Sequence, residues 1–321
     1  MVRFVDRVEE LGKLLDYAEK GFYPILAVYG SEGCGKTRLL KEFIDRVRGR
    51  EDFVAVYIDA LEHQDVGRAL YVSTSIASVV QEVASLASIP VGKFLATNVS
   101  RILQLAEERI RFRGKHVVIA VDDVVRSVGL ETVDVYVKNL LNVVEDLLWR
   151  CGAASVFVVI STSEGLSRYV LAKHRYSYDR LLWNLDRDSF EELVYELKPS
   201  TTIDVDELYR YTGGNPGKLM EIAIGYRWSL DRWFNDVETK IRVLVSDLLS
   251  DERLREVVND IDALTRYGDL AKVLMERNLV IDIRSVPLGR EVATSRDLGI
   301  GRFYAWQVPA YREAVRRVLE E

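Results

Sequence analysis

Short apolar runs alternate with longer amphipathic stretches over residues 1–186. Continuous apolar runs are typical of strands covered on both faces, and the alternation indicates βαβ units on a parallel sheet. The expected strands are residues 24–29, 53–58, 116–121, 155–160 and 180–185. The expected helices are residues 36–47, 68–87, 99–111 and 133–149. The pattern therefore predicts an α/β core.

The remaining pattern is mostly helical and predicts two further domains. Residues 187–229 form a small helical unit, with expected helices at 188–197, 205–212 and 218–226. Residues 230–321 predict three helices at 237–249, 251–264 and 269–277, strands at 279–283 and 302–308, and a last helix. Three helices followed by a two-stranded hairpin are typical of a winged-helix-like domain.

Composition narrows the class of protein. Apolar residues make up 48% of the 321 residues, as in ordinary globular chains. No apolar run is long enough to cross a bilayer and the N-terminus lacks a signal peptide, so we expect a cytoplasmic protein without a membrane partner. Two cysteines indicate neither a disulfide framework nor a zinc site. The net charge of −6 disfavours a dedicated nucleic-acid binder.

One motif carries specific chemistry. Following the apolar run 25–29, the chain fits the phosphate-loop pattern G-x-x-x-x-G-K-[ST] with Gly30-Ser31-Glu32-Gly33-Cys34-Gly35-Lys36-Thr37. The glycines let backbone amides point at phosphates, and the following helix adds its N-terminal dipole. Lys36 is expected to reach the β- and γ-phosphates, and the Thr37 hydroxyl to bind Mg²⁺. Arg38 completes the expected nucleotide contacts.

Acidic and hydroxyl residues follow two other expected strands. Asp122 ends the apolar run 116–121 and is the expected Mg²⁺ partner of Thr37. Asp123 stands where a carboxylate can orient or deprotonate the attacking water. The next strand is followed by hydroxyl residues, one of which can hold that water or contact the γ-phosphate: Ser161, Thr162 and Ser163. The pattern does not choose among the three.

Together these motifs resemble the archaeal ATPase family within the STAND/AAA+-like P-loop NTPases, which are similar to archaeal replication initiators. Arg7 and Glu10 match the family's N-terminal box hh-G-R-E-x-E, whereas Asp6 and Val8 replace its Gly and Glu. The segment Thr212-Gly213-Gly214-Asn215-Pro216 is similar to the family's lid motif, and the C-terminal segments 274–280 and 304–309 are similar to its winged helix.

The resemblance implies an ASCE/AAA+-like core at 1–186, a helical lid at 187–229 and a winged-helix-like domain at 230–321. It implies ATP with Mg²⁺ as the ligands, with Arg7 and Pro216 near the base; adenine is inferred from the family alone. Related initiators carry a lid arginine where this chain has Gly217 and Lys218. Asp123 is also one methylene shorter than the usual Glu. Both departures favour a slow, switch-like ATPase.

An arginine near the γ-phosphate typically accelerates hydrolysis by about 10³–10⁵. After the strand tip, the candidates are Arg168 and Arg175, together with Arg180. Each can act within the chain or on a neighbouring subunit, and each can equally be an ordinary surface cation.

Three uses of the nucleotide cycle remain open. The first is a switch regulated by a protein partner or by self-association. The second is an ATPase that acts on duplex DNA, although basic and acidic residues nearly balance over residues 238–321. The third is a nucleotide-binding scaffold with negligible turnover.

Overall fold

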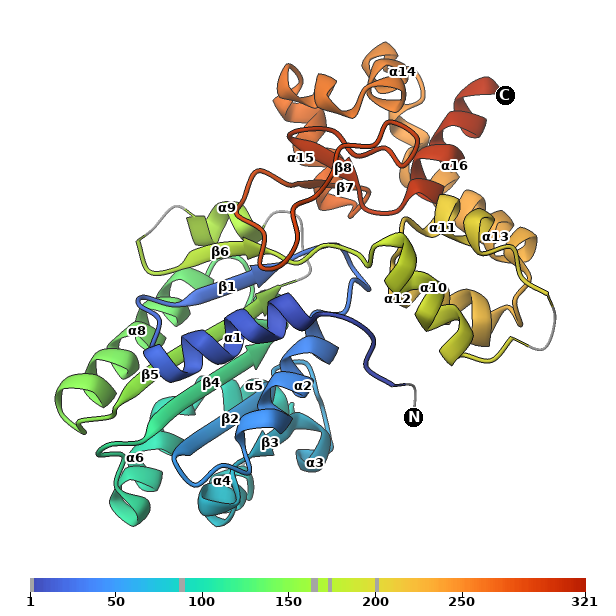
Figure 1. The fold of residues 1–321 in the computed structure, drawn as a ribbon. Helices are drawn as coiled ribbons and strands as arrows, with labels where there is room; N and C mark the ends of the chain where they lie inside the picture. Colours follow the sequence, from blue (N-terminus) through green and yellow to red (C-terminus); the bar gives the residue numbers. More distant parts are fainter. Residues whose placement is uncertain (1–2, 87–89, 163–166, 173–174, 200–201) are drawn as a thin grey trace.

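The computed structural model describes residues 3–86, 90–162, 167–172, 175–199 and 202–321. Figure 1 shows a sheet flanked by helices, formed by the N-terminal part of the chain, and a mostly helical C-terminal part beside it. Among the helices of these residues, none is both long and apolar enough to cross a membrane.

The N-terminal part is built on a six-stranded sheet with the order β3-β2-β4-β5-β1-β6. All neighbouring strands are parallel except β3, which pairs antiparallel with β2. The strands are β1 (Leu26–Tyr29), β2 (Phe53–Asp59), β3 (Leu70–Val72), β4 (His116–Asp122), β5 (Ser155–Thr162) and β6 (Tyr178–Leu181). The central strands are buried along nearly their whole length, as their continuous apolar runs predict.

Helices cover both faces of this sheet, which confirms the α/β core. One face packs against α1 (Val8–Lys20) and α2 (Lys36–Val47). The other face packs against α4 (Ala77–Ala84), α5 (Val91–Thr97), α6 (Val99–Ile110), α7 (Val124–Val128) and α8 (Val133–Trp149). Side chains that alternate along each strand supply the two cores.

One expected helix was wrong. In place of a helix at 68–87, the chain forms α3 (Val66–Ala69), then β3, a 3₁₀ turn at Thr74–Ile76 and α4. Leu70–Val72 pairs with β2 in the register Val56↔Val72. The apolar spacing within this segment does not reveal the strand, because Leu70–Val72 is held by its pairing with β2 and not by a periodicity of its own side chains.

The C-terminal part has one continuous apolar core. Its elements are α10 (Arg187–Glu196), α11 (Val205–Thr212), α12 (Pro216–Met220), a π-helical turn (Glu221–Gly225), α13 (Leu230–Leu244), α14 (Glu252–Asn259), α15 (Gly268–Glu276), β7 (Val280–Asp282), β8 (Tyr304–Trp306) and α16 (Pro309–Glu320). Helix α13 begins earlier than expected because Trp233 and Phe234 are buried in this core. Since side chains from both sides of residue 230 share the core, the boundary there stays a prediction, as does the winged-helix assignment.

The two parts meet along the outer edge of β6. Leu181 forms a parallel bridge with Pro287, in the segment after β7. Tyr29, at the end of β1, donates its hydroxyl hydrogen to the carbonyl of Asp282 at 3.2 Å. The C-terminal part is therefore attached next to the strand that leads into the glycine-rich loop, as Figure 1 shows.

Candidate functional site

The glycine-rich loop connects the end of β1 with the start of α2. Gly33 (φ 83°) and Gly35 (φ 104°) adopt left-handed backbone conformations, which are strained for residues with a Cβ. Lys36 opens α2. The strand–loop–helix order expected for a phosphate loop is therefore present, with backbone amides available at the helix N-terminus.

Lys36 is held inside the loop. Its side chain is buried, and Nζ donates to the carbonyls of Gly30 at 2.9 Å and Ser31 at 3.0 Å. These two carbonyls fix the ammonium group within the turn, where an anion bound by the loop amides would meet it.

Two strand ends are joined through a hydroxyl group beside this loop. Asp122 ends β4 with 1% exposure, and its carboxylate accepts from the hydroxyls of Tyr57 (2.9 Å) and Ser161. Ser161 in turn accepts from the backbone N–H of Asp123 at 3.0 Å. Burial, and after it the charge of Asp122, raises the pKa of Tyr57, so this phenol stays a donor. Ser161 thus connects both aspartates; Thr162 makes neither of these contacts, and Ser163 lies outside the described residues.

Asp123 leaves the strand in a left-handed conformation. Its φ is 52°, and it stands at the N-cap of the short helix α7. Asp tolerates this region better than most residues. This conformation ends β4 and turns the backbone between the two neighbouring aspartates.

Asp59 is a carboxylate that the sequence reasoning missed. It ends β2 and lies in register with Asp122 on the adjacent strand. Burial, and to a smaller extent the charge of Asp122, raises the pKa of Asp59. The available signal was a carboxylate directly after the apolar run 53–58, the same pattern that identified Asp122.

The oxygen donors fit Mg²⁺ bound together with a nucleotide. Helix α2, whose first turn carries Thr37, packs against β4, which ends on Asp122. Within the described ranges, no three His, Cys, Asp or Glu side chains are grouped to hold a metal by themselves. Mg²⁺ usually takes one or two protein oxygens and completes its shell with phosphates and water, so a hydroxyl and a carboxylate suffice.

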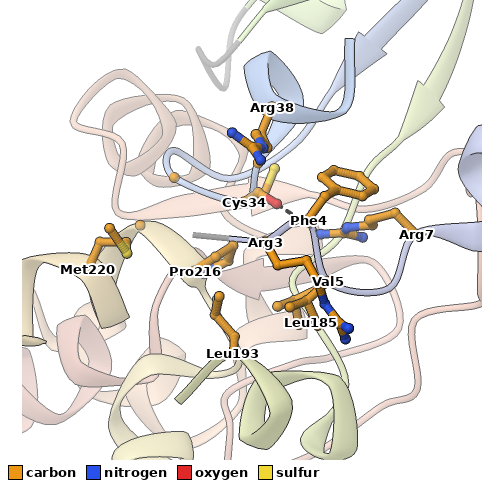
Figure 2. A pocket seen from close by; sticks show the side chains of 13 residues that line it. Arg3, Phe4, Val5, Arg7, Cys34, Arg38, Leu185, Leu193, Pro216 and Met220 are labelled. Carbon is orange, nitrogen blue, oxygen red and sulfur yellow. Dashed lines mark hydrogen bonds between the residues drawn. The ribbon is translucent and has the colours of Figure 1, made fainter. Parts of the chain in front are cut away.

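A mainly apolar cavity of about 390 Å³ opens beside the loop (Figure 2). It lies between the N-terminal segment, the loop and the lid helices, and is lined by Arg3, Phe4, Val5, Arg7, Gly33, Cys34, Gly35, Arg38, Leu185, Leu193, Pro216, Gly217 and Met220. The expected contacts Arg7, Arg38 and Pro216 therefore do line one cavity. Its size and lining suit a planar, weakly polar group such as a nucleobase.

Arg7 supports the walls of this cavity. Its guanidinium is buried and donates to the carbonyls of Cys34 (2.8 Å) and Trp183 (2.6 Å) and to Glu10 (2.9 Å). Asp6, which replaces the glycine of the N-terminal box, has a φ of 56°, the left-handed region that glycine favours. Asp6 therefore adopts a backbone conformation that a glycine would also allow.

The lid touches the loop directly. The amide of Gly217 donates to the carbonyl of Gly33 at 2.9 Å, and Asn215 donates to the carbonyl of Glu32 at 2.9 Å. A Cβ at Gly217 would lie 2.7 Å from the Cα of Gly33, so this approach requires glycine at position 217. Lys218, the expected stand-in for a lid arginine, forms an ion pair with Glu221 at 2.6 Å.

The C-terminal part also reaches the loop. Gln307, which follows β8 and is 1% exposed, accepts from the backbone N–H of Glu32 at 3.0 Å. Its Nε2 is buried without a hydrogen-bond partner among the described residues. The sequence reasoning missed this residue, because 275 positions separate Gln307 from Glu32.

The three candidate arginines lie on or near β6, and Arg180 is within this strand, where it donates to the carbonyl of Asp179 at 2.8 Å. Arg168 forms ion pairs with Asp179 (2.8 Å) and Asp282 (2.6 Å), so its charge is already neutralised at the junction of the two parts. Arg175 is exposed just before β6, at the amino edge of the sheet, whereas the phosphate loop lies at the carboxyl edge. The guanidinium of Arg168 lies 5.1 Å from the centre of the Tyr29 ring, next to the start of the phosphate loop. A role for any of these arginines at the γ-phosphate therefore stays a prediction.

Comparison with known proteins gives consistent matches. Residues 4–222 match the profile of an ATPase domain found predominantly in Archaea. An uncharacterized ATP-binding protein of Methanocaldococcus jannaschii is 24% identical over 305 residues, covering 84% of each chain. Another, from Pyrococcus horikoshii, is 25% identical over 252 residues, covering 72% of this chain and 77% of the relative. The Walker-type ATPase of Pyrococcus abyssi is 16% identical, with a TM-score of 0.55 over 98% of this chain and 96% of its own, which shows a shared fold.

Proposed function

This chain belongs to the family of ATPase domains found predominantly in Archaea, and we propose that it is a slow, Mg²⁺-dependent ATPase used as a conformational switch. One observation carries the proposal: the phosphate loop is contacted both by the lid, through Gly217, and by the C-terminal part, through Gln307. A ligand bound to this loop would therefore change the hydrogen bonds that hold the lid and the C-terminal part against the loop.

ATP would bind with its phosphates at the amides of residues 33–37 and its base in the cavity beside the loop. Lys36 would exchange its bonds to the carbonyls of Gly30 and Ser31 for phosphate oxygens. The cavity walls include Phe4, Leu185 and Met220, which offer apolar contact to a base. Preference for adenine rests on family membership.

For hydrolysis, some residues of the site would hold the metal ion and others would act on the attacking water. Thr37 and Asp122 would hold Mg²⁺, which supplies positive charge to the β- and γ-phosphates. Asp123 would orient the attacking water and accept its proton, while Ser161 fixes the backbone of Asp123 relative to Asp122. Attack in line with the departing phosphate would give ADP and inorganic phosphate.

Slow turnover follows from two features. Asp123 is shorter than the Glu common in hydrolytic relatives, and a water misplaced by about 1 Å can cost on the order of a hundredfold in rate. Arg168 is neutralised by Asp179 and Asp282, so the chain offers no free charge there for the transition state. Such an enzyme depends on a partner or another subunit for a fast step.

A protein partner or self-association is favoured over duplex DNA. Several arginines in the C-terminal part are paired with carboxylates: Arg253 with Asp269, Arg277 with Asp247, Arg284 with Asp282, and Arg316 with Glu313. Phosphate binding by these arginines would require breaking the pairs, which reduces the electrostatic gain on which DNA affinity depends.

The deciding experiment compares Lys36→Ala with the wild type in ATP binding by calorimetry and in phosphate release. We expect the wild type to bind ATP and release phosphate slowly, and Lys36→Ala to lose measurable binding. Lys20→Ala, an exposed lysine at the end of α1, serves as the control and should match the wild type. Unchanged affinity in Lys36→Ala would refute the phosphate site.

The same assay separates the alternative uses. Phosphate release measured with duplex DNA at two salt concentrations should show no stimulation; stimulation that fades with salt would favour the DNA-associated ATPase. Tight ATP binding without any phosphate release would instead favour the scaffold.

A further inference from the structure

Strand β2 ends at Asp59, which pairs with Asp122 in the register of the sheet and lies on the same face. Asp59 and Asp122 are direct partners in the parallel register, so their side chains project from the same face of the sheet. The preceding pair, Ile58 and Val121, belongs to the opposite face and its core. Beyond the strand, Ala60 donates to the carbonyl of Asp122 at 3.1 Å, which keeps the two ends together.

That face is the one covered by the first turns of α2. Tyr57, two residues before Asp59, reaches Asp122 with its hydroxyl at 2.9 Å. The Nζ of Lys41 lies 5.3 Å from the centre of the Tyr57 ring. Thr37 precedes Lys41 by four residues and so belongs to the same stripe of the helix. The stripe that carries Thr37 therefore faces the strand ends that carry Asp59 and Asp122.

The carboxylate of Asp59 accepts one hydrogen bond and lies within the field of the Lys41 ammonium group. Oδ1 accepts from the amide of Leu61 at 3.1 Å, and Oδ2 accepts no hydrogen bond from the residues that the structure describes. A Cβ at Gly92 would lie 2.1 Å from the carbonyl oxygen of Asp59, so close packing fixes the backbone. One carboxylate oxygen therefore remains available at a defined position.

We propose that Asp59 is a positioning residue that accepts hydrogen bonds from the water shell of the Mg²⁺ held by Thr37 and Asp122. The inference rests on the proposed function. Mg²⁺ gives up its waters reluctantly and keeps several of them in nucleotide sites. Partners beyond the direct ligands typically contribute a factor of about 10–100 to metal affinity or activity. The bond to Leu61 alone would make Asp59 a simple turn residue, and an asparagine would serve that purpose equally well.

The test compares ATP affinity in Mg²⁺ with ATP affinity in EDTA, by calorimetry, for the full chain. Asp59→Asn keeps the acceptor for Leu61 and removes the charge. We expect its ATP affinity in EDTA to be no lower than that of the wild type. Its gain from Mg²⁺, which is the ratio of the ATP affinity in Mg²⁺ to the ATP affinity in EDTA, should fall by about tenfold. Asp59→Glu should recover part of that gain. Asp52→Asn, at the opposite end of β2 and paired with Arg50 on the surface, is the matched control and should keep the full gain.

The outcomes separate this inference from the proposed function. A wild type that gains nothing from Mg²⁺ would overturn the metal site and the role of Asp59 together. A full Mg²⁺ gain in Asp59→Asn, beside a normal gain in the wild type, would overturn the role of Asp59 alone. Equal losses in EDTA and in Mg²⁺ would identify Asp59 as a structural residue and would also contradict the proposal.

Discussion

Single hydrogen bonds determine what each carboxylate at the sheet edge can do. The Ser161 hydroxyl donates to Asp122 and accepts from the amide of Asp123, so it links the two aspartates. The sequence predicts the position of the loop after β1 and of Asp122 at the end of β4, because both depend on residues adjacent in the chain. Their catalytic roles stay predictions. The sequence could not choose Ser161 over Thr162 as the partner of Asp122, because that choice depends on the register of β5 against β4, in which Ser161 follows the pair Val121↔Ile160.

At this scale, replacing Asp123 by Asn should separate binding from turnover. Asn adopts the left-handed conformation of this position as readily as Asp, so the strand end should keep its shape. We expect ATP affinity to stay within about twofold and phosphate release to fall by about 10²–10⁴. Single-turnover hydrolysis measures this, with Asp16→Asn on the surface of α1 as the control. Wild-type turnover in Asp123→Asn would remove the residue from the mechanism.

Among elements, the junction of β6, α9 (Ser167–Ala172) and β7 depends on charges that come from distant parts of the chain. Asp282 is 2% exposed and accepts from Arg168, Tyr169 and Arg284. The sequence around Arg168 predicts only a cation after the end of a strand. It does not predict the ion pair with Asp282, which lies far away in the chain. The antiparallel strand β3 was missed because its three residues depend on pairing with β2, whereas helices α2, α8 and α11, which have strong local periodicity, match their expected bounds.

Removing the charge of Asp282 should weaken this junction. Asp282→Asn leaves two guanidinium groups without their shared carboxylate, and breaking such a buried pair costs about 3 kcal/mol. Urea unfolding should show the loss. Asp247→Asn, which disrupts an ion pair with Arg277 at a side chain that is 62% exposed, should cost much less, because solvent screens this pair. Equal stability of the two variants would contradict a buried, charge-dependent junction.

The same carboxyl should contribute to the pH dependence of stability. Burial alone would raise the pKa of Asp282, but Arg284 and Arg168 hold it below its usual range. A carboxyl with a lowered folded-state pKa stabilises the protein above its unfolded pKa, about 3.9, and loses that contribution as pH falls through the folded value. Wild-type unfolding free energy should therefore fall more steeply than that of Asp282→Asn below about pH 4. Parallel curves would exclude this role.

For the molecule as a whole, the phosphate loop is the place where three segments meet. Gly33 binds the lid through Gly217, and Glu32 binds both Asn215 and Gln307. These contacts join the loop to the lid and to the C-terminal part. They could not be predicted from the sequence, because each joins residues more than 180 positions apart.

Gln307→Ala should uncouple the C-terminal part from the nucleotide. In the wild type, ATP should change amide hydrogen exchange at the start of α16, which directly follows Gln307 and Val308. In Gln307→Ala we expect this change to disappear while ATP still binds, because the variant leaves Lys36 and Thr37 intact. Gln104→Ala, in α6 on the far side of the sheet, is the control. Identical ATP-dependent exchange in wild type and Gln307→Ala would refute the coupling.

The two edge strands of the sheet, β3 and β6, limit how copies of this chain can assemble. On one side β3 is three residues long, and on the other the backbone of Leu181 already bonds to the segment around Pro287, a residue that has no amide hydrogen to donate. Neither border offers the long row of unpaired amides and carbonyls that strand addition needs. Copies that do associate should therefore recognise each other through side chains on helices and loops, and such assemblies can form and separate without rebuilding the sheet.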